Sequence, residues 1–188
     1  MDKEDYVEEI KEADFNRDIK EDVLLGKEDH RTDRGIVGSL LCAASMTRPD
    51  ISFDVAGIAG ATNAPKVTDM KRAAKVIKRA KRSKVVLRFP RMEGEVQLIV
   101  YCDAAWGNLD SGKSGGSIFL ALATTNPKGG NEQFCPVNWH AKRLRRVVRS
   151  TFALKTLIAS EAMDEVIYTA EIWSELGNNP VRTTLGTD

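Results

Sequence analysis

The order of β-rich and helical segments in the second half of the chain constrains its fold more than any other feature. After the first strands, a long helix is predicted from Ser150 or Thr151 to about Leu176, and VRTTLGTD (residues 181–188) returns to strand. A helical crossover lets a last strand lie parallel to the first, so the pattern predicts a mixed α/β sheet whose fourth strand pairs beside the first. The β-rich segments before the helix are residues 85–90, 95–106, 114–124 and 134–141.

The first half of the chain predicts helices. Apolar residues at helical spacing begin at Ile36, Pro49 opens a second helix, and Thr68 is expected to cap a third. Residues 1–35 carry many charges and few apolar anchors, which favours a loosely ordered leader. We therefore predict a leader over residues 1–35, a helical segment over 36–84 and an α/β domain over 85–188.

Charge and hydropathy exclude some classes of protein. No apolar run approaches the roughly 20 residues that cross a bilayer, and no signal peptide is visible, so a cytoplasmic or nuclear chain without a membrane partner is expected. The net charge of +1 conceals two basic stretches, with eight Lys or Arg in residues 71–84 and five in residues 142–149. Such stretches suit a nucleic acid, although a solvated helix face has the same composition.

Two acidic residues follow strands that the predicted topology brings together. Asp103 ends the strand over residues 96–102, and Asp188 ends the strand over residues 181–187. Carboxylates that converge repel each other unless a cation lies between them, so the pair predicts a site for Mg²⁺ or Mn²⁺ bound through oxygen. Ordinary turn carboxylates are the alternative interpretation of the same two residues.

Several motifs resemble those of copia-type retrotransposon Pol polyproteins. Residues 38–55 (GSLLCAASMTRPDISFDV) resemble the stretch after the polymerase core, and residues 73–81 (AAKVIKRAK) resemble the helix that precedes the ribonuclease H domain. Residues 101–108 (YCDAAWGN) are similar to the strand that carries the first catalytic Asp. Residues 136–165 are similar to the "PISWxSKKxRRVVxSTxAAET" segment, and the final GTD is similar to the start of "TDNxSL".

The resemblance implies the end of a reverse transcriptase followed by a ribonuclease H-like domain that is incomplete at its C-terminus. The family hydrolyses RNA in RNA–DNA hybrids with Mg²⁺ or Mn²⁺ as cofactor. Its implied partners are the hybrid or another nucleic acid and the rest of the Pol polyprotein. The implied phosphate-binding residues are Lys142, Arg143, Arg145, Arg146 and Arg149.

The same comparison implies a defective catalytic site. A gapless match of "STxAAET" to residues 150–156 puts Lys155 where the family has its catalytic Glu. Glu161 is not a substitute, because six residues rotate a helical side chain by about 600°. The family's fourth acid has no counterpart here, so Asp103 and Asp188 are the metal ligands and catalytic residues that remain. Binding of the metal is therefore doubtful.

Three hypotheses about function follow. The chain is a decayed or truncated Pol fragment without catalysis, or a repurposed module that binds nucleic acid or another partner, or an active nuclease completed by ligands from another chain. Lys155 argues against the third. A stable, monodisperse fold would favour reuse over decay.

Overall fold

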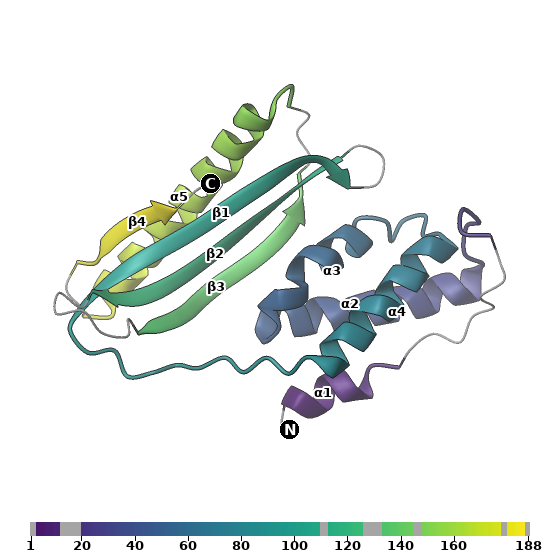
Figure 1. Ribbon diagram of the computed structural model, residues 1–188, viewed down its shortest axis with the longest axis horizontal. Coiled ribbons are helices and arrows are strands. Elements are labelled where there is room, and N and C mark those ends of the chain that lie inside the picture. The colour runs from purple at the N-terminus through teal and green to yellow at the C-terminus, as the bar shows by residue number, and fades with distance from the viewer. Residues whose placement is uncertain are drawn as a thin grey trace. The chain divides into compact units, whose positions relative to one another are not determined.

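A computed structural model describes residues 3–11, 20–109, 113–125, 133–144, 148–177 and 180–186. The chain divides into two compact units, Met1–Val86 and Leu87–Asp188. The first unit is helical, and the second contains a sheet and one long helix (Figure 1). In the ranges given above, no helix is long and apolar enough to cross a membrane.

Amphipathic helices build the first unit. Its elements are α1 (Lys3–Glu9), α2 (Lys27–Met46), the short 3-10 helix η1 (Pro49–Ile51), α3 (Ser52–Ala59) and α4 (Val67–Arg82). Their apolar stripes meet in one core, because residues three and four apart share a helix face. The core includes Val37, Leu40, Ile51, Val55, Ile58, Ala73 and Ile77.

The helix α2 begins at Lys27, ahead of the start at Ile36 that the apolar spacing indicates. Gly26 is its N-cap in an extended conformation, and Glu28 and Asp29 lie in the first turn. Acidic side chains stabilise a helix N-terminus by interacting with its dipole. Glu28 and Asp29 therefore favour helix in the part of α2 that precedes its apolar residues. Two side chains of the charged leader, Val7 and Ile10, also belong to the helical core.

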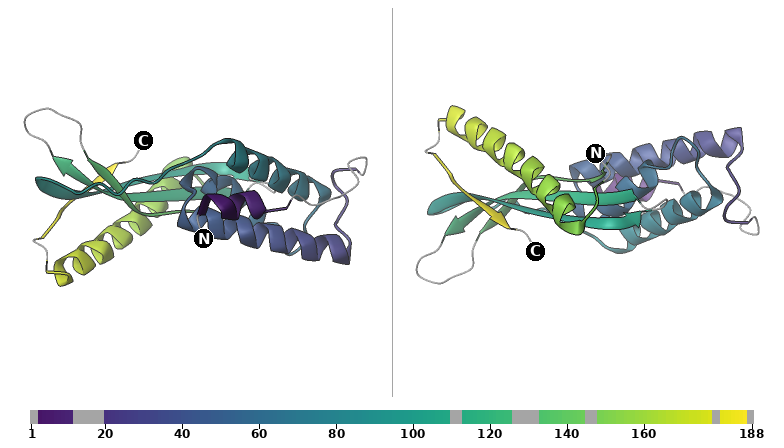
Figure 2. Two further views of the ribbon diagram at one scale, coloured as in Figure 1. Left: turned by 90° about the horizontal axis from the view of Figure 1, so that it is seen from below. Right: turned by 90° about the horizontal axis from the view of Figure 1, so that it is seen from above.

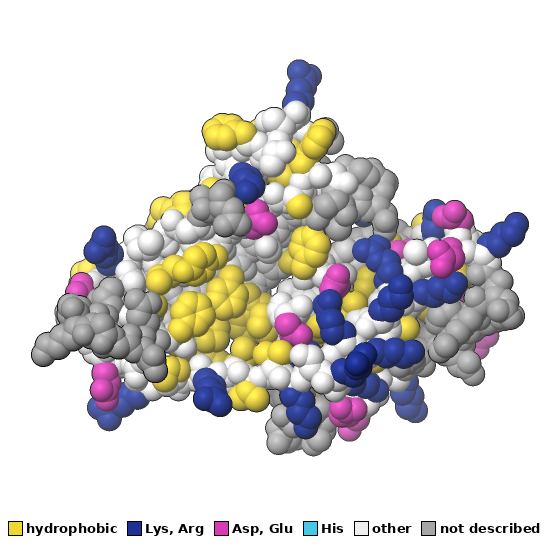
Figure 3. Space-filling model, viewed as in Figure 1, with side chains coloured by type: hydrophobic (Ala, Val, Ile, Leu, Met, Phe, Trp, Pro, Cys, Tyr) yellow, Lys and Arg dark blue, Asp and Glu magenta, His cyan; other side chains and the backbone are white. Residues whose placement is uncertain are grey.

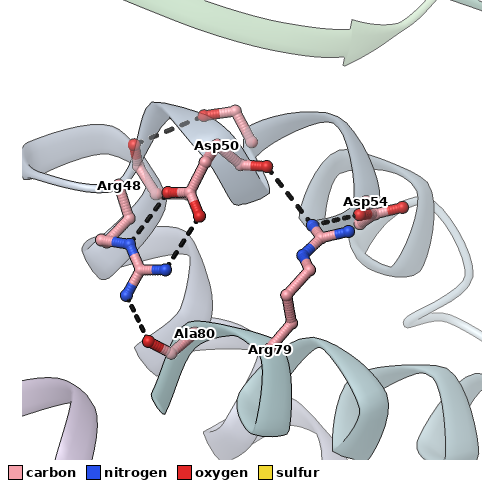
Figure 4. A network of polar contacts seen from close by, with 7 residues as sticks. Arg48, Asp50, Asp54, Arg79 and Ala80 are labelled. Atoms are coloured by element: carbon pink, nitrogen blue, oxygen red, sulfur yellow. Dashed lines mark hydrogen bonds and ion pairs between the residues drawn. The ribbon is translucent and has the colours of Figure 1, made fainter. Parts of the chain in front are cut away.

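A buried arginine joins η1 to the end of α4. Arg48 is 5% exposed, and its Nε and Nη2 donate to the two carboxylate oxygens of Asp50, each at 2.8 Å. Its Nη1 donates to the carbonyl of Ala80 at 2.6 Å (Figure 4). Ala80 lies in the last turn of α4, where carbonyls lack helical partners and carry partial negative charge. The TRPD motif therefore has a structural role in this unit.

The second unit contains a four-stranded sheet with the order β3-β2-β1-β4. The pairs β1–β2 and β2–β3 are antiparallel, and β1 pairs with β4 in parallel. This arrangement confirms the predicted mixed sheet with the fourth strand beside the first, and it is compatible with a ribonuclease H-like fold. The strands are β1 (Glu95–Leu109), β2 (Lys113–Thr125), β3 (Phe134–Arg143) and β4 (Arg182–Gly186).

The helix α5 (Thr151–Glu175) covers one face of this sheet (Figures 1 and 2). Ser150, one of the two caps that the sequence allows, is the N-cap and accepts from the backbone N–H of Ala153 at 3.1 Å. Gly116 of β2 permits the close packing, because a Cβ at that position would lie 2.8 Å from Cδ1 of Ile158. The helix packs through Leu154, Ile158, Ala162 and Val166 against a sheet face that includes Leu98, Val100, Cys102, Ile118 and Leu120.

The β-rich segment over residues 85–90 is not a strand, which corrects the sequence interpretation. Val86 and Phe89 are both 66% exposed. A segment forms a stable strand when it pairs with a neighbouring strand and buries one of its faces. Residues 85–90 pair with none of the described strands, and the exposed Val86 and Phe89 bury no face.

Candidate functional site

Asp103 lies in β1 just past the end of the β1–β4 pairing. The parallel register ends at Tyr101 opposite Gly186, two residues before Asp103. A Cβ at Gly186 would lie 2.7 Å from Cδ1 of Tyr101, so glycine lets β4 approach β1 beside this ring. The Asp103 side chain is 57% exposed, and its Oδ1 accepts from the backbone N–H of Ala104 at 2.7 Å. A carboxylate therefore stands at the carboxyl end of a parallel strand pair, a usual position for a site.

Lys155 of α5 lies beside this carboxylate. The neighbouring Leu154 is fully buried against the sheet, and this contact sets the rotation of the first turns of the helix. Lys155 then lies at the edge of the buried face, with its side chain 35% exposed and its Nζ 3.6 Å from Oδ1 of Asp103. The site thus contains an ion pair between an ammonium and the first predicted metal ligand.

Asp103 and Lys155 also affect the pKa of the neighbouring Cys102. Burial raises the pKa of the Cys102 thiol, the Asp103 carboxylate raises it further, and the Lys155 ammonium lowers it. A thiol with a raised pKa stays protonated at neutral pH and is a poor metal ligand. Cys102 is therefore part of the core below the site.

The described residues do not fit a divalent metal ion. No group of three or more His, Cys, Asp or Glu that could hold a metal occurs in the described ranges. Mg²⁺ and Mn²⁺ favour several oxygen ligands, whereas Asp103 here has an ammonium as its neighbour. Asp188 lies outside the described residues, and its predicted approach to Asp103 stays a prediction.

Glu161 is bound to a different partner. Its Oε2 lies 2.5 Å from Nζ of Lys142 on β3. One turn further along α5, Glu165 lies 3.4 Å from His140 Nε2 and accepts from Asn138 Nδ2 at 3.3 Å. Asn138, His140 and Lys142 alternate along β3, so their side chains share the face toward α5. This polar row holds β3 to the helix and keeps Glu161 with Lys142.

The predicted basic residues are only partly described. Lys142 forms the ion pair with Glu161, Arg143 ends β3, and Arg149 is exposed one residue before the N-cap of α5. Arg145 and Arg146 lie outside the described residues. The described part of this cluster therefore includes one cation that already has a carboxylate partner.

A buried carboxylate in the helical unit was missed by the sequence interpretation. Asp33 of α2 is 1% exposed, and neither of its oxygens has a hydrogen-bond partner among the described residues. Burial raises its pKa, the Asp69 carboxylate raises it further, and His30 lowers it. The available signal was its spacing, because Asp33 precedes Val37 and Leu40 on the apolar stripe of α2.

The chain is similar to a yeast transposon protein. The chain is 31% identical over 136 residues to a protein of Saccharomyces cerevisiae named "Putative transposon Ty5-1 protein YCL074W". The match includes 71% of this chain and 41% of the relative, so the chain spans less than half of that protein. No protein-family model and no solved structure matches the chain. The similarity relates the chain to a transposon protein.

Proposed function

We propose that the chain is a fragment of a retrotransposon Pol polyprotein, with the end of a reverse transcriptase followed by a ribonuclease H-like domain. Three observations support this proposal. A transposon protein is 31% identical over 136 residues. The sheet order β3-β2-β1-β4 is compatible with the ribonuclease H-like fold. The motifs that resemble copia-type Pol proteins follow the family's order along the chain.

The fragment does not cleave RNA under this proposal. The observation that carries the proposal is the 3.6 Å separation between Lys155 Nζ and Asp103 Oδ1. In the family, the position matched by Lys155 holds a glutamate that binds the metal. Lysine in its place changes the local charge by two units, and its ammonium neutralises the carboxylate that should attract the ion.

The repulsion toward a metal ion is large enough to matter. Two unit charges 4 Å apart interact by about 1 kcal/mol in water and about 4 kcal/mol at an effective dielectric constant of 20. A divalent ion doubles either figure, and each 1.4 kcal/mol is about a tenfold loss of affinity. Lys155 therefore lowers metal affinity as well as removing a ligand.

A second function is a non-catalytic module that binds nucleic acid. The observation that favours it is the position of Arg143 and Arg149 on either side of the loop that leads into α5. Phosphate contacts from such residues hold an RNA–DNA hybrid without reading its sequence. Under this alternative the chain binds a hybrid in a salt-dependent manner, although it does not cleave it.

Restoring the acid at position 155 is expected to leave cleavage undetectable. Lys155→Glu removes the ammonium, but the resemblance assigns no residue of this sequence to the family's fourth acid. The measurement is cleavage of a labelled RNA–DNA hybrid in Mg²⁺ and in Mn²⁺, with Lys155→Gln as the matched variant that removes only the charge. Strong cleavage by Lys155→Glu alone would contradict the proposed defect.

A further inference from the structure

The strand β4 is an outer strand of the sheet, and its free edge lacks the features that usually protect such an edge. In the order β3-β2-β1-β4 it pairs with β1 on one side, and no described strand pairs with its other side. The other outer strand, β3, contains Pro136 and a register shift beside it, and both hinder the addition of a further strand. The sequence of β4 (RTTLG) contains no proline, and its pairing with β1 is regular over residues 182–186. An extended segment can therefore add to β4.

An exposed apolar surface lies on the flank of α5 toward this strand. Positions 155, 159, 163 and 167 each follow a buried residue of α5 by one position, so they lie about 100° round the helix from its buried stripe. The first of them, Lys155, lies beside Asp103 of β1, so the row is on the flank toward β1 and β4. Two members of the row are exposed apolar side chains, Met163 at 36% and Ile167 at 53%.

Leu185 extends this apolar surface onto β4. It pairs with Val100 of β1 and therefore shares with it the face of the sheet that α5 covers. Val100 is fully buried, whereas Leu185 is 37% exposed. We call Leu185, Met163 and Ile167 the β4 shelf. A strand that adds to β4 would place every second side chain over this shelf.

The end of α5 that follows the shelf is acidic. Residues 161–175 contain five Asp or Glu and no Lys or Arg. Glu171 and Glu175 continue the row of Met163 and Ile167 at intervals of four residues. Acidic side chains at a helix C-terminus oppose its dipole, so a cation from a partner is favourable there. The surface therefore fits an extended peptide that combines alternating apolar residues with cations.

The chain itself contains a peptide of this kind in residues 85–90 (VVLRFP), which we call the donor segment. It forms no helix and pairs with none of the described strands. Its alternate residues are apolar and would share one face of a strand, namely Val85, Leu87 and Phe89. Arg88 would lie on the other face, and Lys84 and Arg91 flank the segment. Its composition therefore complements both the shelf and the acidic end of α5.

We propose that the donor segment of one copy of the chain adds as a strand to β4 of a second copy. Its apolar face covers the β4 shelf, and its cations lie toward Glu171 and Glu175. Two copies that exchange segments reciprocally form a two-fold symmetric dimer with two identical pairings. Each pairing involves only the short strand β4 and its shelf, so the dissociation constant is expected in the micromolar range.

A different apolar surface provides the competing interface. It lies on the face of the sheet that α5 leaves open, where Figure 3 shows hydrophobic side chains gathered over the strands. Tyr101 and Phe134 are exposed there, and the ring of Phe134 stacks on that of Phe119 with the centroids 5.8 Å apart. The strands β1, β2 and β3 below this surface are already paired with one another, so it could only pack face to face.

Sedimentation equilibrium of the full chain over a range of concentrations tests the proposal. The variant Phe89→Ser alters the donor segment, and Met163→Lys/Ile167→Lys alters the shelf. Each variant is expected to weaken dimerisation by about tenfold or more, because burial of a large apolar side chain contributes that much to affinity. Far-UV circular dichroism of each protein checks that the helices are intact.

Each variant has a matched control that should weaken dimerisation by less than about threefold, because the replaced side chains stay exposed. Val86→Ser replaces a residue with the same 66% exposure as Phe89, on the other face of the donor segment. Tyr168→Lys/Ile172→Lys replaces two exposed apolar residues of α5 that lie about 100° further round the helix than the shelf.

A mixture of the two weakened variants gives a sharper result. Phe89→Ser keeps an intact shelf, and Met163→Lys/Ile167→Lys keeps an intact donor segment, so a mixed dimer regains one of the two pairings. The mixture should therefore dimerise more strongly than either variant alone.

Four outcomes would overturn the proposal. These are a monomer at every concentration, equal effects of the variants and their controls, no gain on mixing, or a dimer that is lost in Phe134→Ser and kept in Phe89→Ser. The last would identify the open face of the sheet as the interface. None of these outcomes affects the proposed function, because that proposal rests on Asp103 and Lys155.

Discussion

Replacing Arg48 by methionine is expected to destabilise the helical unit by about 1.5 to 3 kcal/mol, the usual contribution of hydrogen bonds that involve a charged group. Arg48 is 5% exposed and donates to both carboxylate oxygens of Asp50 and to the carbonyl of Ala80. Methionine keeps much of the side-chain volume but has no donor. The Asp50 carboxylate and the carbonyl at the end of α4 are then left without their partner.

Urea denaturation followed by circular dichroism measures this loss. The matched control is Arg79→Met, because Arg79 donates to the carboxylate of Asp54 at the surface with its own side chain 49% exposed (Figure 4). Exposed ion pairs contribute about 0 to 1 kcal/mol, so the control should change little. Similar losses in the two variants would contradict the structural role of Arg48.

The second substitution with a large expected effect increases the stability of the helical unit. Asp33→Asn is expected to stabilise the helical unit by about 1 kcal/mol or more at neutral pH, because it removes a buried charge whose oxygens have no hydrogen-bond partner among the described residues. Burial is the main cause of the raised pKa of Asp33, followed by the nearby Asp69 carboxylate. Asparagine has nearly the same shape and no charge.

The pH dependence of this effect follows from the direction of the pKa shift. A carboxyl group whose folded pKa lies above the ordinary value of 3.8 binds more protons in the folded state, so it lowers stability as pH rises through that range. Asp33→Asn should therefore resemble the parent below about pH 3.8 and exceed it by a growing margin at higher pH. Above the folded pKa, the margin should be constant.

Thermal unfolding between pH 3 and pH 8 tests the stabilisation at neutral pH and its loss below about pH 3.8, with Asp29→Asn as the control. Asp29 is an exposed residue in the first turn of the same helix, so its replacement should lower stability slightly or leave it unchanged. A lower melting temperature for Asp33→Asn at neutral pH would show that the carboxylate has a stabilising partner.

Local patterns predicted the second unit well. Three β-rich segments, a helix capped by Ser150 and a final strand define the mixed sheet with β4 beside β1. These elements could be predicted because the turn and cap residues are local, and because a helical crossover restricts where the last strand can pair.

Other features depended on tertiary contacts that a local pattern does not contain. Residues 85–90 have strand composition but no strand partner among those described. Acidic residues at the helix start extend α2 back to Lys27, and packing buries Asp33 on its apolar stripe. In the candidate site, the alignment of motifs identified Asp103 and Lys155, whereas the ion pair between Lys142 and Glu161 became visible only when β3 and α5 were placed together.

We propose that the chain does not cleave RNA–DNA hybrids, because Lys155 pairs with Asp103 and the motif match supplies no fourth acid. The most direct test incubates the purified chain with a labelled RNA–DNA hybrid in Mg²⁺ and, separately, in Mn²⁺, beside the variant Asp103→Asn. We predict that the parent and the variant give the same background with either ion. Cleavage by the parent that disappears in Asp103→Asn would contradict the claim and show that the site is completed despite Lys155.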